Sequence, residues 1–298
     1  MPSVNRAAAL FRPPSEHYEN FPVASWLCPA ALRAPIAAIY WFARSADDIA
    51  DEGAAPAAQR LSDLTHYRAD LTSAAQGQPY SGRWPEVFGA LAPMITKFHL
   101  PVHLLADLLD AFEQDVVFTA EGRRYQTDLE LLDYCRRSAN PIGRLLLHLY
   151  GVRGELALAQ SDQICTALQL INFWQDLRCD LARARWYPSA EQMALHGVSD
   201  ADLLSDSVSA QARDMLASYA YAAWSMMLRG APLADRIPGR AGWELRLVIQ
   251  GGLRILEKMA AMQHATWRRR PRLGKGDAAL LLWRAWRKDY WRHVALPA

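Results

Sequence analysis

The chain has 298 residues, a length that suits one large domain or two small ones. Hydrophobic residues make up 51% of it and the formal net charge is +2, which excludes a disordered chain and a nucleic-acid binder driven by bulk charge. No stretch of about 18 apolar residues predicts a membrane span, and residues 1–11 lack the apolar core of a signal peptide. We therefore expect a cytoplasmic protein.

Helical periodicity runs through nearly the whole sequence, and no segment alternates as a half-buried strand would. No long Pro/Gly/Ser linker and no repeat of about 20–50 residues divides the chain. The sequence predicts an all-α fold, a single-domain helical bundle. The expected helices span residues 35–52, 58–75, 85–98, 103–118, 128–151 (interrupted at 140–141), 161–182, 207–228, 243–268 and 277–294.

The four cysteines show no metal-binding pattern. None belongs to a Cys-x-x-Cys pair or to a Cys/His cluster with zinc spacing. We expect buried thiols in a reducing compartment at Cys28, Cys135, Cys165 and Cys179.

Four acids close the first expected helix: Asp47, Asp48, Asp51 and Glu52. Like charges four residues apart repel, and acids at the C-terminal end of a helix oppose its dipole, so the cluster favours a bound cation. Mg²⁺ is typically held by one or two carboxylates together with substrate phosphates. An exposed acidic helix end is the alternative for this motif alone.

A second polar stripe lies on the helix expected at 161–182. Gln169, Asn172, Asp176 and Asp180 follow one another at spacings of three, four and four, so the last three share one face. The residues around them are apolar, and polar oxygens in such surroundings are costly unless they are paired or bind metal. Two such helices facing each other would make a carboxylate-lined site in a bundle, where metal sites are commonly found.

With both stripes in place, the chain resembles the squalene/phytoene synthase family of prenyl transferases. Its first Asp-rich motif is matched by Tyr40, Arg44, Asp47, Asp48 and Asp51, and its second by Gln169, Asn172, Asp176 and Asp180. The basic-aromatic stretch that follows is matched at Arg185 and Tyr187, although Pro188-Ser189 stands where many relatives have Leu-Pro. The resemblance runs from about His17 to Lys275 and implies the isoprenoid synthase fold with a central apolar cavity.

Within the family, the chain is most similar to the hydroxysqualene synthases of hopanoid biosynthesis. The residues that carry this similarity are 19–23, 46–53 and 134–144. Phytoene and squalene synthases usually have a small-residue run where this chain has Arg-Ser-Ala-Asn-Pro, ending at Pro141. Because Pro141 removes a helix hydrogen bond, it predicts a kink that turns Asn140 toward the cavity to hold a water. A structural kink away from the substrate is the alternative.

The resemblance implies a reaction and a cofactor. Mg²⁺ held by the two Asp stripes would neutralise the diphosphate leaving group. His17, Arg44, Gln169, Arg185 and Tyr187 would contact the diphosphate, Arg44 and Arg185 through their guanidinium groups. An apolar tunnel would shield the carbocation, with the rings of Tyr40 and Tyr134 beside it. For this subgroup, presqualene diphosphate would lose diphosphate and capture water to give hydroxysqualene.

Two other functions fit the same motifs. The first is condensation of two farnesyl diphosphates to presqualene diphosphate, squalene or dehydrosqualene, and the segment Arg136–Gly143 is what separates the two reactions. The second is a non-catalytic assembly factor, although such a protein would be expected to lose acids from the paired stripes, and this chain keeps both.

The C-terminal end differs in composition from the rest of the chain. A basic run, residues 267–275, precedes a segment rich in Leu, Trp and Arg, residues 280–294. That composition suits a helix at the inner membrane face or a helix packed on the bundle with snorkelling basic side chains, and of the two we favour the packed helix. We divide the chain into an N-terminal segment, 1–16, an isoprenoid synthase-like domain, 17–275, and a C-terminal amphipathic helix, 276–298.

Overall fold

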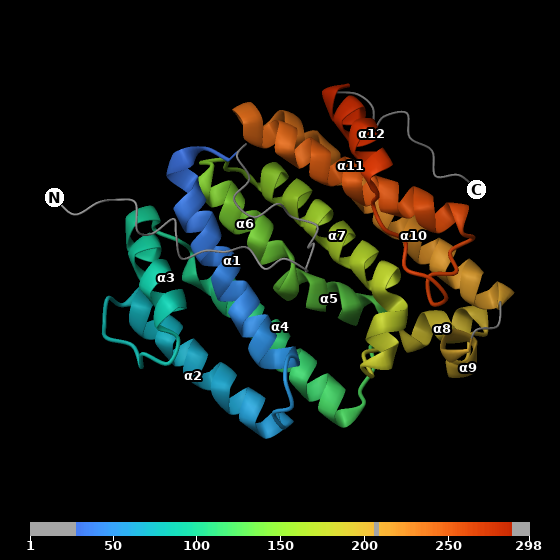
Figure 1. Cartoon of the computed structure of the whole chain (residues 1–298), viewed down its shortest axis with the longest axis horizontal. Coiled ribbons are helices and arrows are strands. Elements are labelled where there is room, and N and C mark those ends of the chain that lie inside the picture. Colours follow the sequence, from blue (N-terminus) through green and yellow to red (C-terminus); the bar gives the residue numbers. More distant parts are fainter. Residues whose placement is uncertain (1–27, 206–208, 288–298) are drawn as a thin grey trace.

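The computed structural model describes residues 28–205 and 209–287, which form helices joined by short connections and contain no strand (Figure 1). This confirms the all-α prediction. In chain order the elements are α1 Ala30–Asp51, α2 Ala57–Ala75, α3 Pro85–Phe98, α4 Val102–Glu121, α5 Asp128–Ser138, α6 Asn140–Leu149, α7 Glu155–Ala182, α8 Ala190–His196, α9 Asp200–Leu204, α10 Ala210–Gly230, the 3₁₀ turn η2 Ala231–Asp235, α11 Gly239–Ala261 and α12 Lys275–Trp286.

Local capping explains several ends that periodicity alone misplaced. Helix α1 begins at Ala30, five residues before the expected start, because the amide of Leu32 bonds the carbonyl of Pro29 ahead of the internal Pro35. The short helices α8 and α9 were not predicted. Each begins at a serine cap, Ser189 and Ser199, and is too short to show a periodic apolar face.

The expected interruption near residue 140 is a complete break. Helix α5 ends at Ser138 and α6 starts at Asn140, with Ala139 at φ −120° between them. Pro141 lies in the first turn of α6, where a missing backbone N–H costs nothing. The predicted interruption at 140–141 is therefore confirmed, and it divides the segment 128–151 into two separate helices.

The described residues bury two hydrophobic clusters, one on each side of the molecule. One lies among α1–α4 and includes Phe42, Tyr67 and Phe88. The other lies among α5, α7, α10 and α11 and includes Trp174. Three of the cysteines are buried as expected, but Cys179 is exposed, because it lies on the outer side of α7 next to Arg178.

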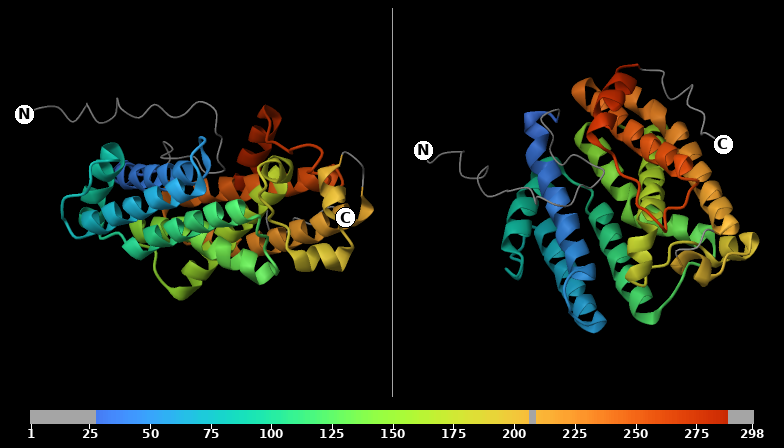
Figure 2. Two further views of the ribbon diagram at one scale, coloured as in Figure 1. Left: turned by 90° about the horizontal axis from the view of Figure 1, so that it is seen from below. Right: turned by 45° about the vertical axis from the view of Figure 1, so that its right-hand side comes forward.

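Helices α1 and α7 run in the same direction, with α5 and α6 between them (Figure 1). Their N-terminal halves contribute Ile36 and Ile164 to one cavity, and their C-terminal ends are joined by ion pairs from Arg183 and Arg185 to Asp51. Helix α12 lies at the edge of the molecule, against α11 (Figure 2). None of the helices in the described part is long and apolar enough to cross a bilayer.

Candidate active site

The acids at the end of α1 form one cluster. Carboxylate oxygens of Asp47, Asp48 and Asp51 lie within 4.8 Å of one another. The guanidinium of Arg44, one turn earlier, lies 3.2 Å from a carboxylate oxygen of Asp47 and 2.7 Å from one of Asp48. Burial nonetheless raises the pKa of Asp48, so Arg44 offsets only part of the cost of this charge.

A residue outside the predicted motifs holds the turn that follows these acids. Arg60 of α2 donates to the backbone carbonyls of Ile49 and Gly53, at 2.9 and 2.8 Å, and to a third at Ala55. These bonds satisfy carbonyls that the end of a helix leaves free, and they place a positive charge where the helix dipole is negative. Arg60 therefore fixes the backbone that carries the first acidic motif.

Asp51 links the two acidic helices. Its Oδ2 atom lies 3.5 Å from the Arg183 guanidinium and 3.2 Å from that of Arg185, both just past the end of α7. Its other oxygen, Oδ1, is buried and accepts no hydrogen bond from any described residue. A buried carboxylate oxygen without a donor is costly. Together with the neighbouring carboxylates, it offers the oxygen ligands that a hard divalent cation prefers, so the cluster fits Mg²⁺.

The predicted stripe on α7 is continuous, and its members differ in their partners. Asp176 is held by Arg270, from the connection between α11 and α12, through both carboxylate oxygens. Burial raises the pKa of Asp180 to about 7, and the negative charge of Asp176 one turn away adds to the rise. Gln169 and Asn172 are half-buried and form no hydrogen bond with the described residues.

Asp115 of α4 belongs to the same site, and the sequence analysis did not identify it. Its carboxylate accepts a 2.6 Å hydrogen bond from the Tyr134 hydroxyl. Burial raises its pKa to about 6, while Arg185 opposes the rise and Asp51 adds to it. Asp115 follows Leu108 and Phe112 at helical spacing, so a lone acid on an apolar face was the available signal.

Aromatic rings line the side of the site next to α7. Tyr187 stacks on Phe173 with ring centres 3.6 Å apart, and Tyr134 lies 6.4 Å from Tyr187. Burial raises the pKa of both tyrosine hydroxyls well above 10, so each remains a neutral donor. Tyr40 lies on α1 one turn before Arg44, with its ring edge-on to Trp41 at 5.3 Å.

Asn140 does not lie on the wall of the apolar cavity. Its side-chain carbonyl accepts a 3.0 Å hydrogen bond from the hydroxyl of Thr166 on α7, and the residue is buried. The residues of α6 that line the cavity are Gly143, Leu146, Leu147 and the following Tyr150. The expectation that the proline-induced kink turns Asn140 into this cavity was therefore wrong, because the helix breaks there and Thr166 takes up the amide oxygen.

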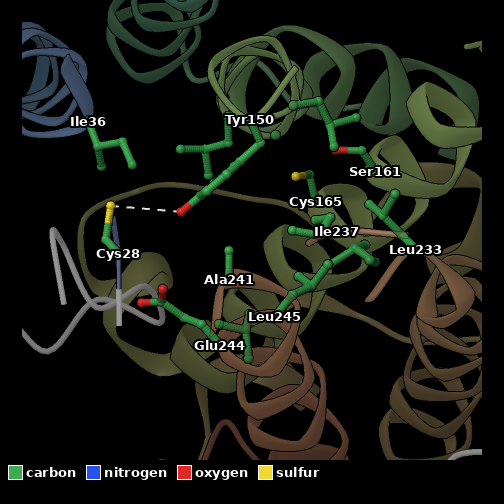
Figure 3. A pocket seen from close by; sticks show the side chains of 15 residues that line it. Cys28, Ile36, Tyr150, Ser161, Cys165, Leu233, Ile237, Ala241, Glu244 and Leu245 are labelled. Atoms are coloured by element: carbon green, nitrogen blue, oxygen red, sulfur yellow. Dashed lines mark hydrogen bonds between the residues drawn. The ribbon is translucent and has the colours of Figure 1, made fainter. Parts of the chain in front are cut away.

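The cavity itself has a volume of about 110 Å³ and lies among α1, α6, α7, η2 and α11 (Figure 3). Most of the side chains that line it are apolar. Its few polar groups include Glu244 and the Tyr150 hydroxyl, which is directed at the sulfur of Cys28 at 3.8 Å. Ile36 of α1 and Ile164 of α7 line it. On each helix an acid follows 12 residues later, Asp48 on α1 and Asp176 on α7. At 1.5 Å per residue, each acid lies about 18 Å along its helix from the cavity.

One predicted site residue, His17, lies outside the described residues, as does the run 19–23. The other predicted residues lie on α1, on α5 and α6, and on α7 and the turn after it.

A family model described as Squalene/phytoene synthase matches residues 15–277. The chain belongs to the squalene/phytoene synthase family. Its relatives include the hydroxysqualene synthase of Zymomonas mobilis, 38% identical over 66% of this chain and 63% of that protein. The hydroxysqualene synthase of Sinorhizobium fredii is 30% identical over 82% of this chain and 79% of that protein. The phytoene synthase of Thermus thermophilus is 29% identical over 92% and 90%.

Solved structures of the family have the same fold. Squalene synthase HpnC from Alicyclobacillus acidocaldarius superimposes with a TM-score of 0.74 at 31% identity, covering 83% of this chain and 90% of that one. A dehydrosqualene synthase in complex with a ligand superimposes with a TM-score of 0.76 at 20% identity over 90% of each chain. The fold is therefore that of the squalene/phytoene synthase family.

Proposed function

We propose that the chain converts presqualene diphosphate to hydroxysqualene in a magnesium-dependent reaction of hopanoid biosynthesis. The observation that supports diphosphate chemistry is the pair of acidic helix ends, joined through Asp51 and about 18 Å along α1 and α7 from an apolar cavity. An amphiphile with a charged head and a long apolar tail suits such a site. The relatives named hydroxysqualene synthase support the choice of reaction within the family.

In this proposal the acids and arginines hold the charged end of the substrate. Asp47, Asp48 and Asp51 on one side, and Asn172, Asp176 and Asp180 on the other, hold Mg²⁺, which when bound neutralises the developing charge on the diphosphate. Arg44 and Arg185 lie at the edge of this site and bind phosphate oxygens through their guanidinium groups. Gln169, Tyr187 and His17 complete the proposed diphosphate contacts.

The apolar and aromatic residues act on the other end of the substrate. The apolar cavity, about 18 Å along the helices from the acids, receives the far end of a prenyl tail. The stacked rings of Phe173 and Tyr187, nearer to the acids, keep water from the carbocation. Tyr134 is kept neutral by burial and fixed by its bond to Asp115, so that its ring faces the site from α5, and Tyr40 is placed on α1. Asn140, held by Thr166, is proposed to fix the α5–α6 break near the position where water adds.

Four incubations test the proposed reaction. The purified chain is given Mg²⁺ with presqualene diphosphate or with farnesyl diphosphate, with and without NADPH, and the lipid products are identified by mass spectrometry. Hydroxysqualene from presqualene diphosphate without NADPH supports the proposal. Product only from farnesyl diphosphate favours the condensing activity, which is the alternative that the phytoene synthase relatives keep open.

The acids provide the control for the metal site. We expect Asp48→Asn combined with Asp176→Asn to lower turnover by about a thousandfold or more, because both groups of ligands lose a charge. Full turnover by this variant would contradict the metal site. No turnover by the wild-type chain with either substrate would favour the assembly factor. The proposed domain, residues 17–275, contains every site residue of this account.

A further inference from the structure

Helix α12 packs on α11 through charged side chains. Asp277 and Arg284 are 6% and 8% exposed, which is unusual for such residues. Asp277 pairs with Arg254 at 2.8 Å and with Lys258 at 2.6 Å, and Arg284 pairs with Glu257 at 2.7 Å. These pairs satisfy the buried charges, so the inner face of α12 is ionic.

The outer face of the same helix is apolar. Leu282 and Trp283 are 48% and 47% exposed, and Trp286 is 75% exposed. Ala278 and Ala279 continue this face one turn earlier and are exposed too. An ordinary surface helix buries its apolar side and exposes its polar side. Helix α12 does the reverse. Trp283 and Trp286, three residues apart, form an exposed apolar patch rather than isolated surface residues.

The charge around this face is positive. Asp277 is the one acidic residue between positions 262 and 287, and its carboxylate is buried against α11. Five cations of this segment are exposed and have no ion pair with the described residues: Arg268, Arg269, Arg272, Lys275 and Arg287. Arg287 lies over the ring of Trp283 at 5.3 Å. An apolar face with tryptophans and flanking cations matches a lipid surface that carries negative charge.

This face adjoins the candidate active site. Three side chains near the C-terminal end of α7 bind the connection that leads into α12. Gln175 donates to the carbonyl of Pro271 at 2.8 Å, Asp176 binds Arg270, and Arg178 donates to the carbonyl of Arg268 at 2.9 Å. The basic segment therefore runs from the acidic end of α7 directly to the apolar face of α12.

We propose that the outer face of α12 and the cations beside it bind the surface of an anionic membrane. This inference deepens the proposed function, on which it rests for its purpose: a membrane is the phase in which a long prenyl substrate and its product dissolve. A second copy of the chain fits less well, because it would bring an equally basic surface against this one. Residues 288–298 bring Lys288 and Arg292, and so supply no net negative charge to match the cations.

Vesicle flotation of the full chain, without substrate or magnesium, tests the binding separately from turnover. We expect the chain to float with vesicles of phosphatidylcholine and phosphatidylglycerol, and to be released at high salt, because screening weakens the contact. Trp283→Ser combined with Trp286→Ser should reduce the partition coefficient about tenfold or more. A matched variant, Leu129→Ser with Leu195→Ser, removes two side chains that are 77% and 72% exposed on α5 and α8, and should bind as the wild type does.

A second variant keeps the apolar face and alters the charge. Arg272→Gln with Lys275→Gln should weaken binding to anionic vesicles about thirtyfold, because each cation near such a surface contributes about 1 kcal/mol to binding. Binding to pure phosphatidylcholine should be unchanged. Circular dichroism of each variant should match the wild type, since the replaced side chains are exposed.

Three results would overturn the membrane assignment. The first is equal flotation of the wild type and the tryptophan variant. The second is a concentration-dependent dimer in sedimentation that the tryptophan variant loses, which would assign the face to a second copy. The third is flotation only by a chain that ends at Arg287, which would assign the face to residues 288–298. Because none of these measurements involves turnover, a failure of the proposed reaction is read separately from them.

Discussion

The raised pKa of Asp180 predicts how stability depends on pH and magnesium. Its folded pKa of about 7 lies about three units above the ordinary value of 3.8, chiefly because of burial. Since the folded chain holds this proton and the unfolded chain does not, stability falls as the pH rises from about 4 to 7. Three units correspond to about 4 kcal/mol, which we reduce to about 2 kcal/mol for the solvent that still reaches the carboxylate.

Asp180→Asn removes this titration and keeps the shape of the side chain. Without divalent metal, we expect the Tm of the wild type to fall about 2–3 °C further than that of the variant between pH 5 and pH 8, at about 2 °C per kcal/mol, because a little over half of the loss falls within this interval. Mg²⁺ should stabilise the wild type more than the variant at pH 8, because a bound cation favours the charged carboxylate that only the wild type has at position 180. Differential scanning calorimetry at the two pH values, with Mg²⁺ or EDTA, makes the comparison.

Asp115 titrates in the same direction, with a pKa of about 6, but it is present in both proteins and cancels in the difference. Parallel loss of Tm in the wild type and Asp180→Asn would refute the reasoning. So would equal stabilisation of both proteins by Mg²⁺.

Two further substitutions test packing and the metal site. Gly143→Ala should lower the free energy of unfolding in urea by about 1–3 kcal/mol, because the new Cβ would lie 2.3 Å from the Ser161 hydroxyl oxygen. The control Gly89→Ala should be neutral or stabilising, since its Cβ meets nothing nearer than 3.8 Å. Equal losses in the two variants would contradict the close helix contact at Gly143. Arg270→Gln should raise the affinity for Mn²⁺ about tenfold in calorimetric titration without substrate, since it frees Asp176, and weaker binding would show that Arg270 does not compete with metal.

Residues that lie close together in sequence could be predicted. Periodicity located most of the long helices, and the bounds of α3 were predicted as observed. The acids of the first motif lie within one turn of a helix, so their clustering follows from the spacing. The stripe at Asn172, Asp176 and Asp180 lies on one helix for the same reason.

The remaining contacts come from residues far apart in sequence. Arg270 reaches Asp176 across 94 positions, and Arg60 reaches the end of α1 from the next helix, so neither could be read from a local pattern. At Asn140 the local pattern was misleading. Its sequence neighbours suggested an amide that faces the cavity, but the amide binds Thr166, 26 positions away. Tertiary partners decide where such side chains point.

The central claim is that water captures a cation formed from presqualene diphosphate at this site. The most direct measurement is a single incubation of the purified chain with presqualene diphosphate and Mg²⁺ in water enriched in ¹⁸O, without NADPH, followed by mass spectrometry of the lipid product. The account predicts hydroxysqualene that carries ¹⁸O in its hydroxyl group. Squalene or dehydrosqualene as the product, or a hydroxyl group without the label, would contradict it.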